Sequence, residues 1–429
     1  MRVLQGDDDK GRKYVARLAG RMRELFSAEL DQRVRRVVAD VAKNGDKALV
    51  GLVRKHDLKG LSVKSSRLQG RVESGEDVGD DFVKAVELAL ANLKEFHEPQ
   101  ALKGYALEHE SGDLRIRVRP LDSVGVYVPG GAAVYISSLL MAAVPARIAG
   151  VPRIAVATPP RAFLSSPQLR YVLDRLDLRE VYLMGGAHAV AALAYGTDSV
   201  TPVDKIVGPG GRWVAAAKRA VFGEVDVDSI AGPSEVAIVA DAHAEPEIVA
   251  ADMLAQAEHD PDALALLVTP SRALAEKVER RIKARLRALP KASPAHQSMK
   301  RWGGIVLVRS LEGAVELVNF IAPEHVELLV EEPLRFLDSV DRAGAVFLGP
   351  LSPVVLGDYV VGTNHILPTG GAARFGSPLG VWDFVRRSAV VRVAPHRYRV
   401  LARAAAILAR YEELPLHAEA VLAGTRAKT

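Results

Sequence analysis

The sequence contains no cysteine, few aromatic residues and no long uninterrupted apolar segment. Without cysteine the chain has no disulfide bond, no thiolate-bound zinc, no iron–sulfur cluster and no cysteine nucleophile. The thiohemiacetal route from an aldehyde to an acid is therefore closed to this protein. Phe, Trp and Tyr make up 5% of the 429 residues, which is too few for the stacking platforms of proteins that bind single-stranded nucleic acid.

The chain also lacks a strong charge of either sign. Its 57 Lys and Arg against 52 Asp and Glu leave a net charge of +5, without a dense basic block, so we expect no nucleic-acid partner. The mainly apolar stretch 136–151 is interrupted by Pro145 and Arg147 and is too short to span a bilayer. The first residues are acidic, then basic, without the apolar core of a signal peptide. We therefore expect a cytoplasmic protein with no membrane partner.

The remaining composition is that of a folded protein. Hydrophobic residues account for 49% and charged residues for 25% of the chain, as in ordinary globular domains. At roughly 100–200 residues per domain, this length predicts two to four domains.

Two kinds of hydrophobic periodicity divide the chain. In the first hundred residues the apolar positions recur every three or four residues, which predicts helices over 12–30, 32–41 and 80–96, with Asn44-Gly45 as a stop signal. From about residue 115, short β-branched runs alternate with helical stretches, which indicates βαβ units and mainly parallel sheets. The predicted strands are 124–128, 154–157, 181–184, 236–239, 264–268, 305–308, 326–330 and 345–348.

This alternation occurs in two blocks, 127–235 and 236–379. Each block has its own glycine-rich turns, so we predict two α/β domains with parallel sheets rather than one large sheet. After residue 387 an Arg- and Ala-rich helical pattern over 398–411 predicts a small C-terminal helical unit.

Gln256 and His259 end a helical run that begins near Pro246. Residues three apart share one helix face, and two donor side chains on one face can begin a metal site. A solvated polar helix end explains the same spacing, and spacing alone favours that interpretation.

Asp358 and His365 lie in a glycine-containing segment after the predicted strand 345–348. Loops that follow the carboxyl ends of parallel strands build the sites of doubly wound sheets. Gly357 and Gly362 would keep such polar groups near the rim of the sheet. A glycine-rich surface loop is an equally good interpretation.

Glu324 and His325 are adjacent, between a predicted helix and a predicted strand. Neighbouring side chains diverge by about 100° in a helix and 180° in a strand, so joint action requires irregular backbone, which Pro323 favours. A carboxylate that deprotonates water beside an imidazole that moves protons is a workable acid–base pair. The dipeptide by itself also occurs by chance.

Four glycine-rich elements lie near strand ends. Backbone N–H groups between a strand and a helix can hold phosphate or carbonyl oxygens, although a tight turn explains each element as well. No element spells G-x-G-x-x-G, so the standard dinucleotide fingerprint is absent. The elements are residues 128–131, 185–187, 208–211 and 231–234.

In their order and spacing these segments resemble the L-histidinol dehydrogenases, the family that catalyses the last step of histidine biosynthesis. The resemblance covers nearly the whole chain. The segments that carry it are VGVYVPGG (124–131), GGAHAVAALAYGT (185–197), VDKIVGPGG (203–211), AGPSEV (231–236), QAEHD (256–260), APEHVE (322–327), GDYVVGTNHILPT (357–369) and ARFGSPLGVWDF (373–384).

The resemblance implies two cofactors, NAD and one Zn²⁺ per subunit, and assigns residues to each function. It implies that Glu324 activates water and that His325 is the acid–base group. The implied metal ligands are Gln256, His259, Asp358 and His417. The implied substrate contacts are Ser234, His365 and Glu412 together with His325 and those four ligands, and the implied cofactor contacts are Tyr127, His188 and Gly211.

The resemblance also implies an intertwined homodimer with shared active sites, in which the C-terminal unit with Glu412 and His417 reaches the partner's site. Both α/β domains would be incomplete Rossmann-like units. The implied division of the chain is an N-terminal helical segment 1–22, a first α/β domain 23–126 plus 236–379 with the metal and catalytic residues, a second α/β domain 127–235 on the cofactor side, and a C-terminal helical unit 380–429.

Three positions depart from the family pattern. The family usually has Gln where this chain has His188, and Asn where it has Gly211. A histidine still forms hydrogen bonds, whereas Gly211 removes a side-chain amide. The family's Glu-Gly-Leu reads Glu412-Glu413-Leu414 here. The cofactor positions therefore leave the affinity for NAD open, while the metal and substrate positions are intact.

The resemblance predicts NAD-dependent oxidation of L-histidinol to L-histidine through L-histidinal. In a chain without thiols, hydration of the aldehyde by a base-activated water is the remaining simple path to the acid, and two hydrides must leave in each turnover. One alternative is a dehydrogenase of another small amino alcohol or polyol. Others are a zinc-dependent hydrolase that uses Glu324 and the metal, and a non-catalytic metal- or nucleotide-binding protein.

Overall fold

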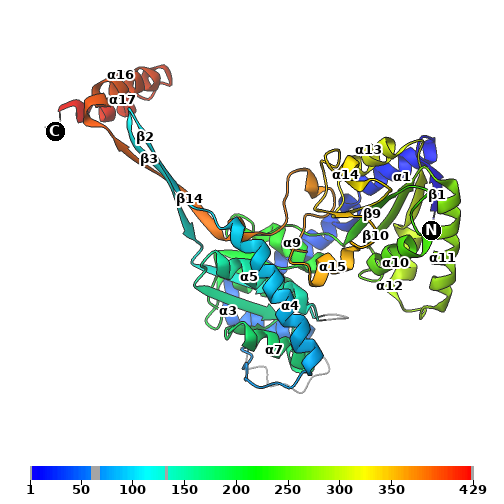
Figure 1. Cartoon of the computed structure of the whole chain (residues 1–429). Coiled ribbons are helices and arrows are strands. Elements are labelled where there is room, and N and C mark those ends of the chain that lie inside the picture. The colour runs from blue at the N-terminus through cyan, green and yellow to red at the C-terminus, as the bar shows by residue number, and fades with distance from the viewer. Residues whose placement is uncertain (1, 59–67, 131–133, 427–429) are drawn as a thin grey trace.

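The computed structural model describes residues 2–58, 68–130 and 134–426. They form two parallel sheets covered by helices, and a long antiparallel ribbon that carries a pair of helices away from both sheets (Figure 1). The predicted α/β class with two parallel sheets is confirmed, and the ribbon adds a small antiparallel sheet. Gly131 of the element 128–131 lies outside the described residues.

The larger parallel sheet has six strands and is covered by helices on both faces. The strands are β1 (Arg2–Gln5), β9 (Glu235–Ala240), β10 (Leu264–Thr269), β11 (Gly304–Leu307), β12 (His325–Leu329) and β13 (Ala345–Leu348). Their order is β1-β11-β10-β9-β12-β13. Alternate residues of the central strands pack against two helical layers, which is why these strands read as continuous hydrophobic runs. The first layer contains α1 (Asp9–Ala19) and α13 (Leu311–Ile321), and the second contains α10 (Pro246–Ala257), α11 (Arg272–Ala288) and α12 (Pro294–Arg301).

The smaller parallel sheet has five strands in the order β6-β5-β4-β7-β8. The strands are β4 (Ser123–Tyr127), β5 (Arg153–Thr158), β6 (Val181–Leu183), β7 (Lys205–Val207) and β8 (Asp226–Val227). One face packs against α3 (Ala28–His56), α8 (Gly186–Tyr195) and α9 (Arg212–Val221). The other packs against α4 (Asp80–His97), α5 (Ile136–Ile148) and α7 (Pro167–Arg175). The short helices are α2 (Met22–Leu25), α6 (Pro160–Ser165), α14 (Pro333–Leu337), α15 (Val354–Tyr359), η1 (Glu98–Gln100), η2 (Ala372–Arg374), η3 (Val381–Phe384) and η4 (Gly424–Arg426).

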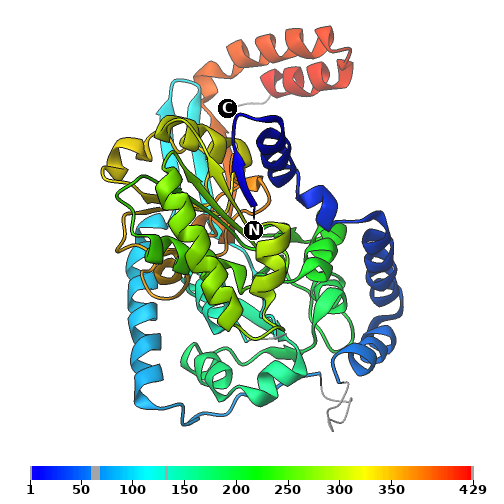
Figure 2. The same cartoon turned by 90° about the vertical axis from the view of Figure 1, so that its right-hand side faces the viewer.

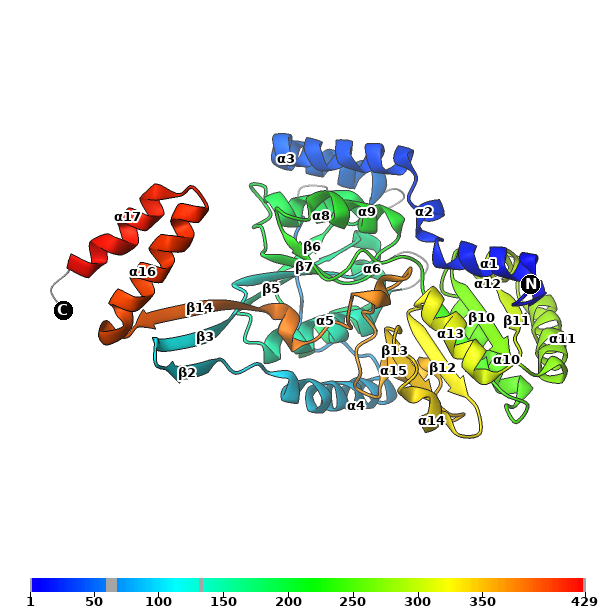
Figure 3. The ribbon, with the colours of Figure 1, turned by 90° about the horizontal axis from the view of Figure 1, so that it is seen from above.

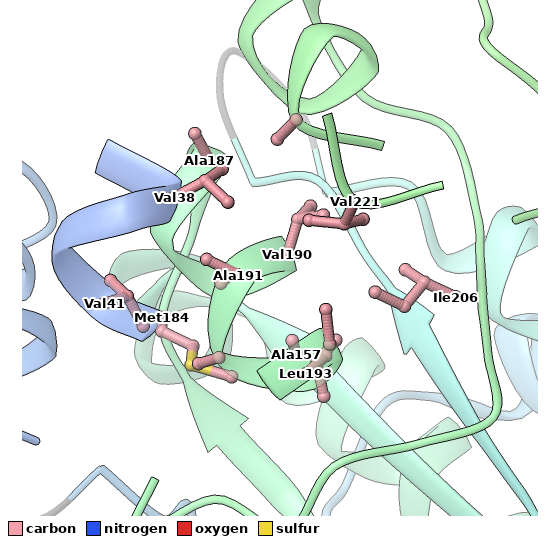
Figure 4. Close-up of a cluster of buried hydrophobic side chains, with 14 of the residues drawn as sticks. Val38, Val41, Ala157, Met184, Ala187, Val190, Ala191, Leu193, Ile206 and Val221 are labelled. Carbon is pink, nitrogen blue, oxygen red and sulfur yellow. The ribbon is translucent and has the colours of Figure 1, made fainter. Parts of the chain in front are cut away.

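Helix α3 belongs to the smaller sheet because its apolar face fits α8. Val38 and Val41 of α3 lie against Ala187 and Ala191 of α8, whose small side chains allow a close approach (Figure 4). The stop predicted at Asn44-Gly45 is confirmed as a break within α3, because Gly45 leaves helical geometry (φ 52°, ψ −133°). A second helical segment follows the kink and runs to His56, and its apolar face packs in the same core.

The antiparallel ribbon consists of β2 (Tyr105–His109), β3 (Gly112–Pro120) and β14 (Val385–Val393), in the order β14-β3-β2. β14 leads into α16 (Pro395–Tyr411) and α17 (Pro415–Ala423), which pair with each other far from both parallel sheets (Figures 1 and 3). We call the ribbon and these two helices the C-terminal arm. Most side chains of β2 and β14 are exposed, so these two strands lack the half-buried alternation that would have predicted them. β3 does alternate, with Leu114, Ile116 and Val118 half-buried and the arginines between them exposed, and this strand was missed in the prediction from sequence.

All eight predicted strands are present. Several elements, however, pack with a different sheet from the one that the predicted domain boundaries imply. The segment 1–22 is not entirely helical, because β1 pairs in parallel with β11 at the edge of the larger sheet. Within 23–126, predicted to join the larger sheet, α3, α4 and β4 pack with the smaller one. The N-terminal helices therefore pass from one sheet to the other, as Figures 2 and 3 show. None of the described helices is long and apolar enough to cross a membrane.

Candidate active site

A cavity of about 750 Å³ lies between the two parallel sheets and is lined by loops from both. The smaller sheet contributes the segments after β4 and β7, at the carboxyl ends of its strands, among them Pro129 and Gly211. The larger sheet contributes its opposite edge, because Ser234, His259 and Glu324 precede the strands β9, β10 and β12. The expectation that the segment after strand 345–348 reaches the site is confirmed, because Asp358 and His365 follow β13 and line the cavity.

Glu324 and His325 line this cavity side by side. Helix α13 ends at Ala322 in a left-handed conformation (φ 53°, ψ 63°), and Pro323 and Glu324 lead into β12. This irregular backbone, which Pro323 predicted, turns both side chains to one side, and Glu324 Oε2 lies 3.6 Å from His325 Nδ1. His325 Nδ1 is also 2.9 Å from the carbonyl oxygen of Glu235. Because that carbonyl can only accept, Nδ1 carries the proton and the lone pair of Nε2 remains free for chemistry.

Burial sets the protonation of the pair. It raises the pKa of Glu324 well above its usual value and lowers the pKa of His325 to about 4. His325 is therefore neutral at pH 7 and ready to accept a proton. The raised pKa makes the Glu324 carboxylate, when it is ionised, a stronger base than an exposed one.

Three of the four implied metal ligands line the same cavity, namely Gln256, His259 and Asp358. Gln256 is buried, and no described atom forms a hydrogen bond with its Nε2. Burial raises the pKa of Asp358 to about 7 and lowers that of His259. A buried amide without a partner, a desolvated carboxylate and a neutral imidazole are the donors that a cation would stabilise. These residues therefore fit a metal, although among the described residues no three His, Asp or Glu side chains gather into a metal-binding group.

The helix prediction for two of these ligands needs one adjustment. Gln256 lies in the last turn of α10, but the helix ends at Ala257, so His259 lies in the turn that follows. The peptide N–H of His259 still donates to the carbonyl of Gln256 at 3.4 Å, which keeps both residues at the same helix end.

His365 and Ser234 complete the implied contacts within this cavity. His365 Nδ1 is 2.7 Å from the backbone oxygen of Asp358, and its Nε2 is 3.1 Å from the hydroxyl of Ser138. Asp358 is part of α15 rather than of a loop, and His365 follows this short helix. The hydrogen bond between the His365 ring and the Asp358 carbonyl keeps the two residues together, although only Asp358 belongs to the helix.

Of the implied cofactor contacts, Gly211 lines the cavity, whereas Tyr127 and His188 are buried beside the start of α8. The Tyr127 hydroxyl accepts from the Gly186 N–H at 3.0 Å, and His188 Nε2 is 2.8 Å from Asp57 Oδ2. That carboxylate also accepts from the Gly185 N–H at 2.9 Å. Asp57 lies far from α8 along the chain, and no pattern around it pointed to this contact.

Gly211 is the residue that directly precedes α9, and it leaves the N-terminus of this helix without a side-chain cap. Within the described part of the chain, no atom lies within 4 Å of the position that a Cβ of Gly211 would take, and no side chain caps the helix. The first peptide N–H groups of α9 are therefore available to an anion such as a phosphate.

Glu412 and His417 are exposed on the C-terminal arm and do not reach the cavity of their own chain (Figure 1). Glu413, at the family's glycine position, adopts a left-handed backbone with φ 59°. Within the described chain, the ribbon connects Glu412 and His417 to the part that contains the cavity.

Comparison with known proteins identifies the family. A family model for histidinol dehydrogenase matches residues 21–424. The histidinol dehydrogenase of Halalkalibacterium halodurans is 45% identical over 90% of this chain and 92% of that protein, and the one of Thermotoga maritima is 42% identical over 96% of this chain and 97% of that protein. The crystal structure of histidinol dehydrogenase from Elizabethkingia anophelis superposes with a TM-score of 0.84, at 34% identity, over 93% of this chain and 92% of that chain.

The chain belongs to the histidinol dehydrogenase family.

In this member of the family, further buried charged residues lie around the cavity. They were not predicted from the sequence. Glu235, of the AGPSEV segment, and Arg21, which precedes α2, form a buried ion pair with 2.7 Å between Arg21 Nε and Glu235 Oε1. Asp252, four residues before Gln256 in α10, is the neighbour of Glu327 of β12. Burial raises the pKa of Glu327 to about 8 and that of Asp252 to about 6, so this acid pair holds a proton at neutral pH. Glu327 also accepts from the N–H of Val354 at 3.0 Å, which anchors the start of α15.

Proposed function

We propose that this protein oxidises L-histidinol to L-histidine through L-histidinal and passes two hydrides to two molecules of NAD. The observation that carries the proposal is the buried Glu324-His325 pair in the wall of a cavity shared by both sheets. Neutral His325 takes the proton of the substrate hydroxyl while the first hydride leaves. Glu324 then deprotonates the water that hydrates the aldehyde, and the hydrate loses the second hydride.

A zinc ion would be held by Gln256, His259 and Asp358 of one subunit and by His417 of another. When bound, it supplies a positive charge that polarises the hydroxyl group and holds the amine of the substrate. His365 and Ser234 line the same cavity, where they can orient the imidazole of the substrate.

The nicotinamide cofactor would lie towards the smaller sheet. The uncapped start of α9 at Gly211 supports this placement, because its free N–H groups suit a phosphate. Tyr127 and His188 would border the cofactor from the start of α8. Their present hydrogen bonds to Gly186 and Asp57 hold them at that position.

We propose that a second copy of the chain supplies His417 and Glu412, which the cavity lacks in its own chain. The arm exposes a series of apolar side chains, which a monomer would leave in water. A symmetric dimer would cover them and would carry His417 and Glu412 into the partner's cavity. The most exposed apolar residues of the arm helices are Tyr411 (86%), Leu416 (73%) and Leu408 (64%), with Val400 and Ile407 also exposed.

The decisive experiment incubates the purified protein with Zn²⁺, L-histidinol and NAD and follows the formation of NADH. We expect two NADH for each histidinol consumed, with L-histidine as the product. No NADH with histidinol, together with NADH from another small amino alcohol or a polyol, would replace the proposed substrate. No NADH from any alcohol would refute the dehydrogenase activity.

A further inference from the structure

We propose that Arg21 and Glu235 form a buried clamp that holds the Glu324-His325 pair in its reactive position. Both are positioning residues, because they act through the pair and do not themselves line the surface at which Glu324 and His325 work. The inference rests on the proposed function, since it concerns the same two reacting side chains.

Glu235 holds the pair by three contacts. Its peptide N–H donates to Glu324 Oε2 at 2.8 Å, and its own Oε2 accepts from the peptide N–H of Glu324 at 3.0 Å. Its carbonyl oxygen accepts from His325 Nδ1 at 2.9 Å. One residue thereby sets the orientation of the Glu324 carboxylate, the path of its backbone and the tautomer of the imidazole.

The remaining oxygen of Glu235 is held from two other segments. Oε1 lies 2.7 Å from Arg21 Nε and accepts from the N–H of Gly370 at 2.9 Å. Gly370 is left-handed (φ 63°), and a Cβ there would meet Cγ of Met22 at 2.1 Å, so the loop lies directly on α2. Both carboxylate oxygens of Glu235 are therefore in use.

Arg21 connects the clamp to the rest of the cavity wall. Its Nη2 donates to the carbonyl of Pro233 at 2.7 Å, next to Ser234, and its Nη1 to the carbonyl of Asp262 at 3.3 Å, after the His259 turn. Arg21 directly precedes α2, the short helix where the chain passes from one sheet to the other. Leu25 and Phe26, at the far end of this helix, line the cavity. The guanidinium thus connects the turn before β9, which carries Ser234, with the turn before β10, which carries His259.

Stability alone does not account for this ion pair. Both side chains are fully buried, at 0% and 1% exposure, and desolvation of two charges cancels most of their attraction, so well-packed apolar residues would serve a core equally well. A fixed dipole and a fixed charge beside two reacting groups are what catalysis requires, because the site then needs no reorganisation during the reaction. The position of the pair therefore points to a role in orienting Glu324 and His325.

A double-mutant cycle tests the clamp. Glu235→Gln keeps the shape but cannot accept at both Oε positions, and it leaves Arg21 without its counter-charge. We expect it to lower kcat for histidinal oxidation about 10²-fold, within the range of general-base assistance, with KM for histidinal and zinc content within about threefold of wild type. In the Glu324→Gln background the same change should cost less than about threefold, because the group it orients is already gone.

Arg21→Lys enters the same cycle as the second variant, because it keeps the buried charge and loses the contacts to Pro233 and Asp262. We expect a smaller loss than for Glu235→Gln and the same dependence on Glu324. Glu24→Gln is the matched control, since it removes an exposed ion pair with Arg17 from the same short helix and should leave kcat unchanged.

Three outcomes would overturn the clamp. One is an equal loss for Glu235→Gln in the wild-type and Glu324→Gln backgrounds, which marks a general structural role. The second is wild-type kcat for both Glu235→Gln and Arg21→Lys, and the third is a loss that lies entirely in KM. Wild-type protein without activity on histidinol refutes the proposed function instead, and the cycle is then run with whichever alcohol the wild-type protein oxidises.

Discussion

The cavity and the C-terminal arm are built in opposite ways. Around the cavity the polar side chains are buried and held by several partners, as for Glu324 and His325. On the arm Glu412 and His417 are exposed, and among the described residues of α16 and α17 only Ala402, Ala406 and Ala418 are buried. The cavity side chains are held by contacts within the chain, although the proposed metal site still needs His417. The described part of the arm buries few side chains, so the proposed position of its functional residues depends on a second copy of the chain.

The ribbon explains how far apart the two regions lie. β3 and β14 pair over their full nine-residue lengths, from Gly112–Val393 to Pro120–Val385. At about 3.3 Å per residue, such a ribbon carries α16 and α17 roughly 30 Å outwards. The nine paired residues on each strand suit the proposed role of the arm, which is to carry His417 and Glu412 to the cavity of a second copy.

The largest effect is expected at the centre of the cavity. His325→Ala should lower the rates of both half-reactions by about 10³- to 10⁴-fold, because each oxidation needs a proton acceptor at this place. Single-turnover measurements of NADH formed from histidinol and from histidinal test this. His243→Ala, which changes an exposed histidine of the same sheet domain, should have no effect. A loss confined to one half-reaction would contradict the shared role.

Glu324→Gln should separate the two half-reactions. Oxidation of histidinal, and therefore the overall reaction, should slow about 10²-fold, because the water that hydrates the aldehyde loses its base. The first hydride transfer and zinc binding should be preserved. The same single-turnover experiment measures both steps, and equal losses in them would leave the carboxylate with a general electrostatic role only.

Metal binding compares the cavity and the arm directly. His259→Asn in the cavity and His417→Asn on the arm should each lower zinc affinity by at least about 10- to 100-fold, since even outer partners of a metal site contribute that much. Metal analysis after dialysis against a weak chelator measures the loss. Undiminished zinc in His259→Asn would refute the cavity site. Undiminished zinc in His417→Asn would show that the arm does not contribute a ligand to the metal site.

Mixing two inactive variants tests whether the arm serves another subunit. His325→Ala and His417→Ala should regain about a quarter of wild-type activity after subunit exchange, because half of the randomly formed dimers are mixed and each holds one intact site. Each variant mixed with itself under the same treatment is the control. Absence of any recovery, despite exchange shown by a mass-tagged subunit, would mean that His417 and His325 do not meet across chains.

The smallest effect is local to the arm. Glu413 is left-handed at φ 59°, a conformation that costs a non-glycine residue about 1 kcal/mol. Glu413→Gly should therefore stabilise this turn by about 0.5–1 kcal/mol, visible as slower amide hydrogen exchange in residues 412–418. Glu419→Gly, within α17, should do the reverse by about 1 kcal/mol. Faster exchange in the first variant would contradict the strain at this turn.

The predictions from sequence succeeded where a local pattern reports burial. The β-branched runs became the buried strands of the two parallel sheets, and Pro323 marked the irregular backbone that turns Glu324 and His325 together. They failed where burial leaves no local trace. β2 and β14 are exposed, so no alternation marked them, and β1 becomes a strand only because it pairs with β11. β3 is the exception, because its alternating half-buried and exposed residues are visible in the sequence but were not recognised as a strand.

The buried charges show the same limit more sharply. Nothing near Arg21 in the sequence marks it as a buried ion-pair partner, because its counter-charge Glu235 lies over two hundred positions away. The same is true of Asp57, which becomes the partner of His188 only when α3 packs against α8.

By itself the sequence determined the chemistry that is available: no thiol, an adjacent carboxylate and imidazole, a set of oxygen and nitrogen donors, and the run of strands and helices that carries them. The tertiary structure decided which of these groups meet. It brought the amino edge of one sheet against the carboxyl edge of the other, enclosed Arg21 and Glu235 behind the reacting pair, and left His417 on an arm away from its own cavity. The reason is physical, since composition and periodicity report what each residue's neighbours in the chain impose, whereas these contacts arise only when segments far apart in the sequence exclude water together.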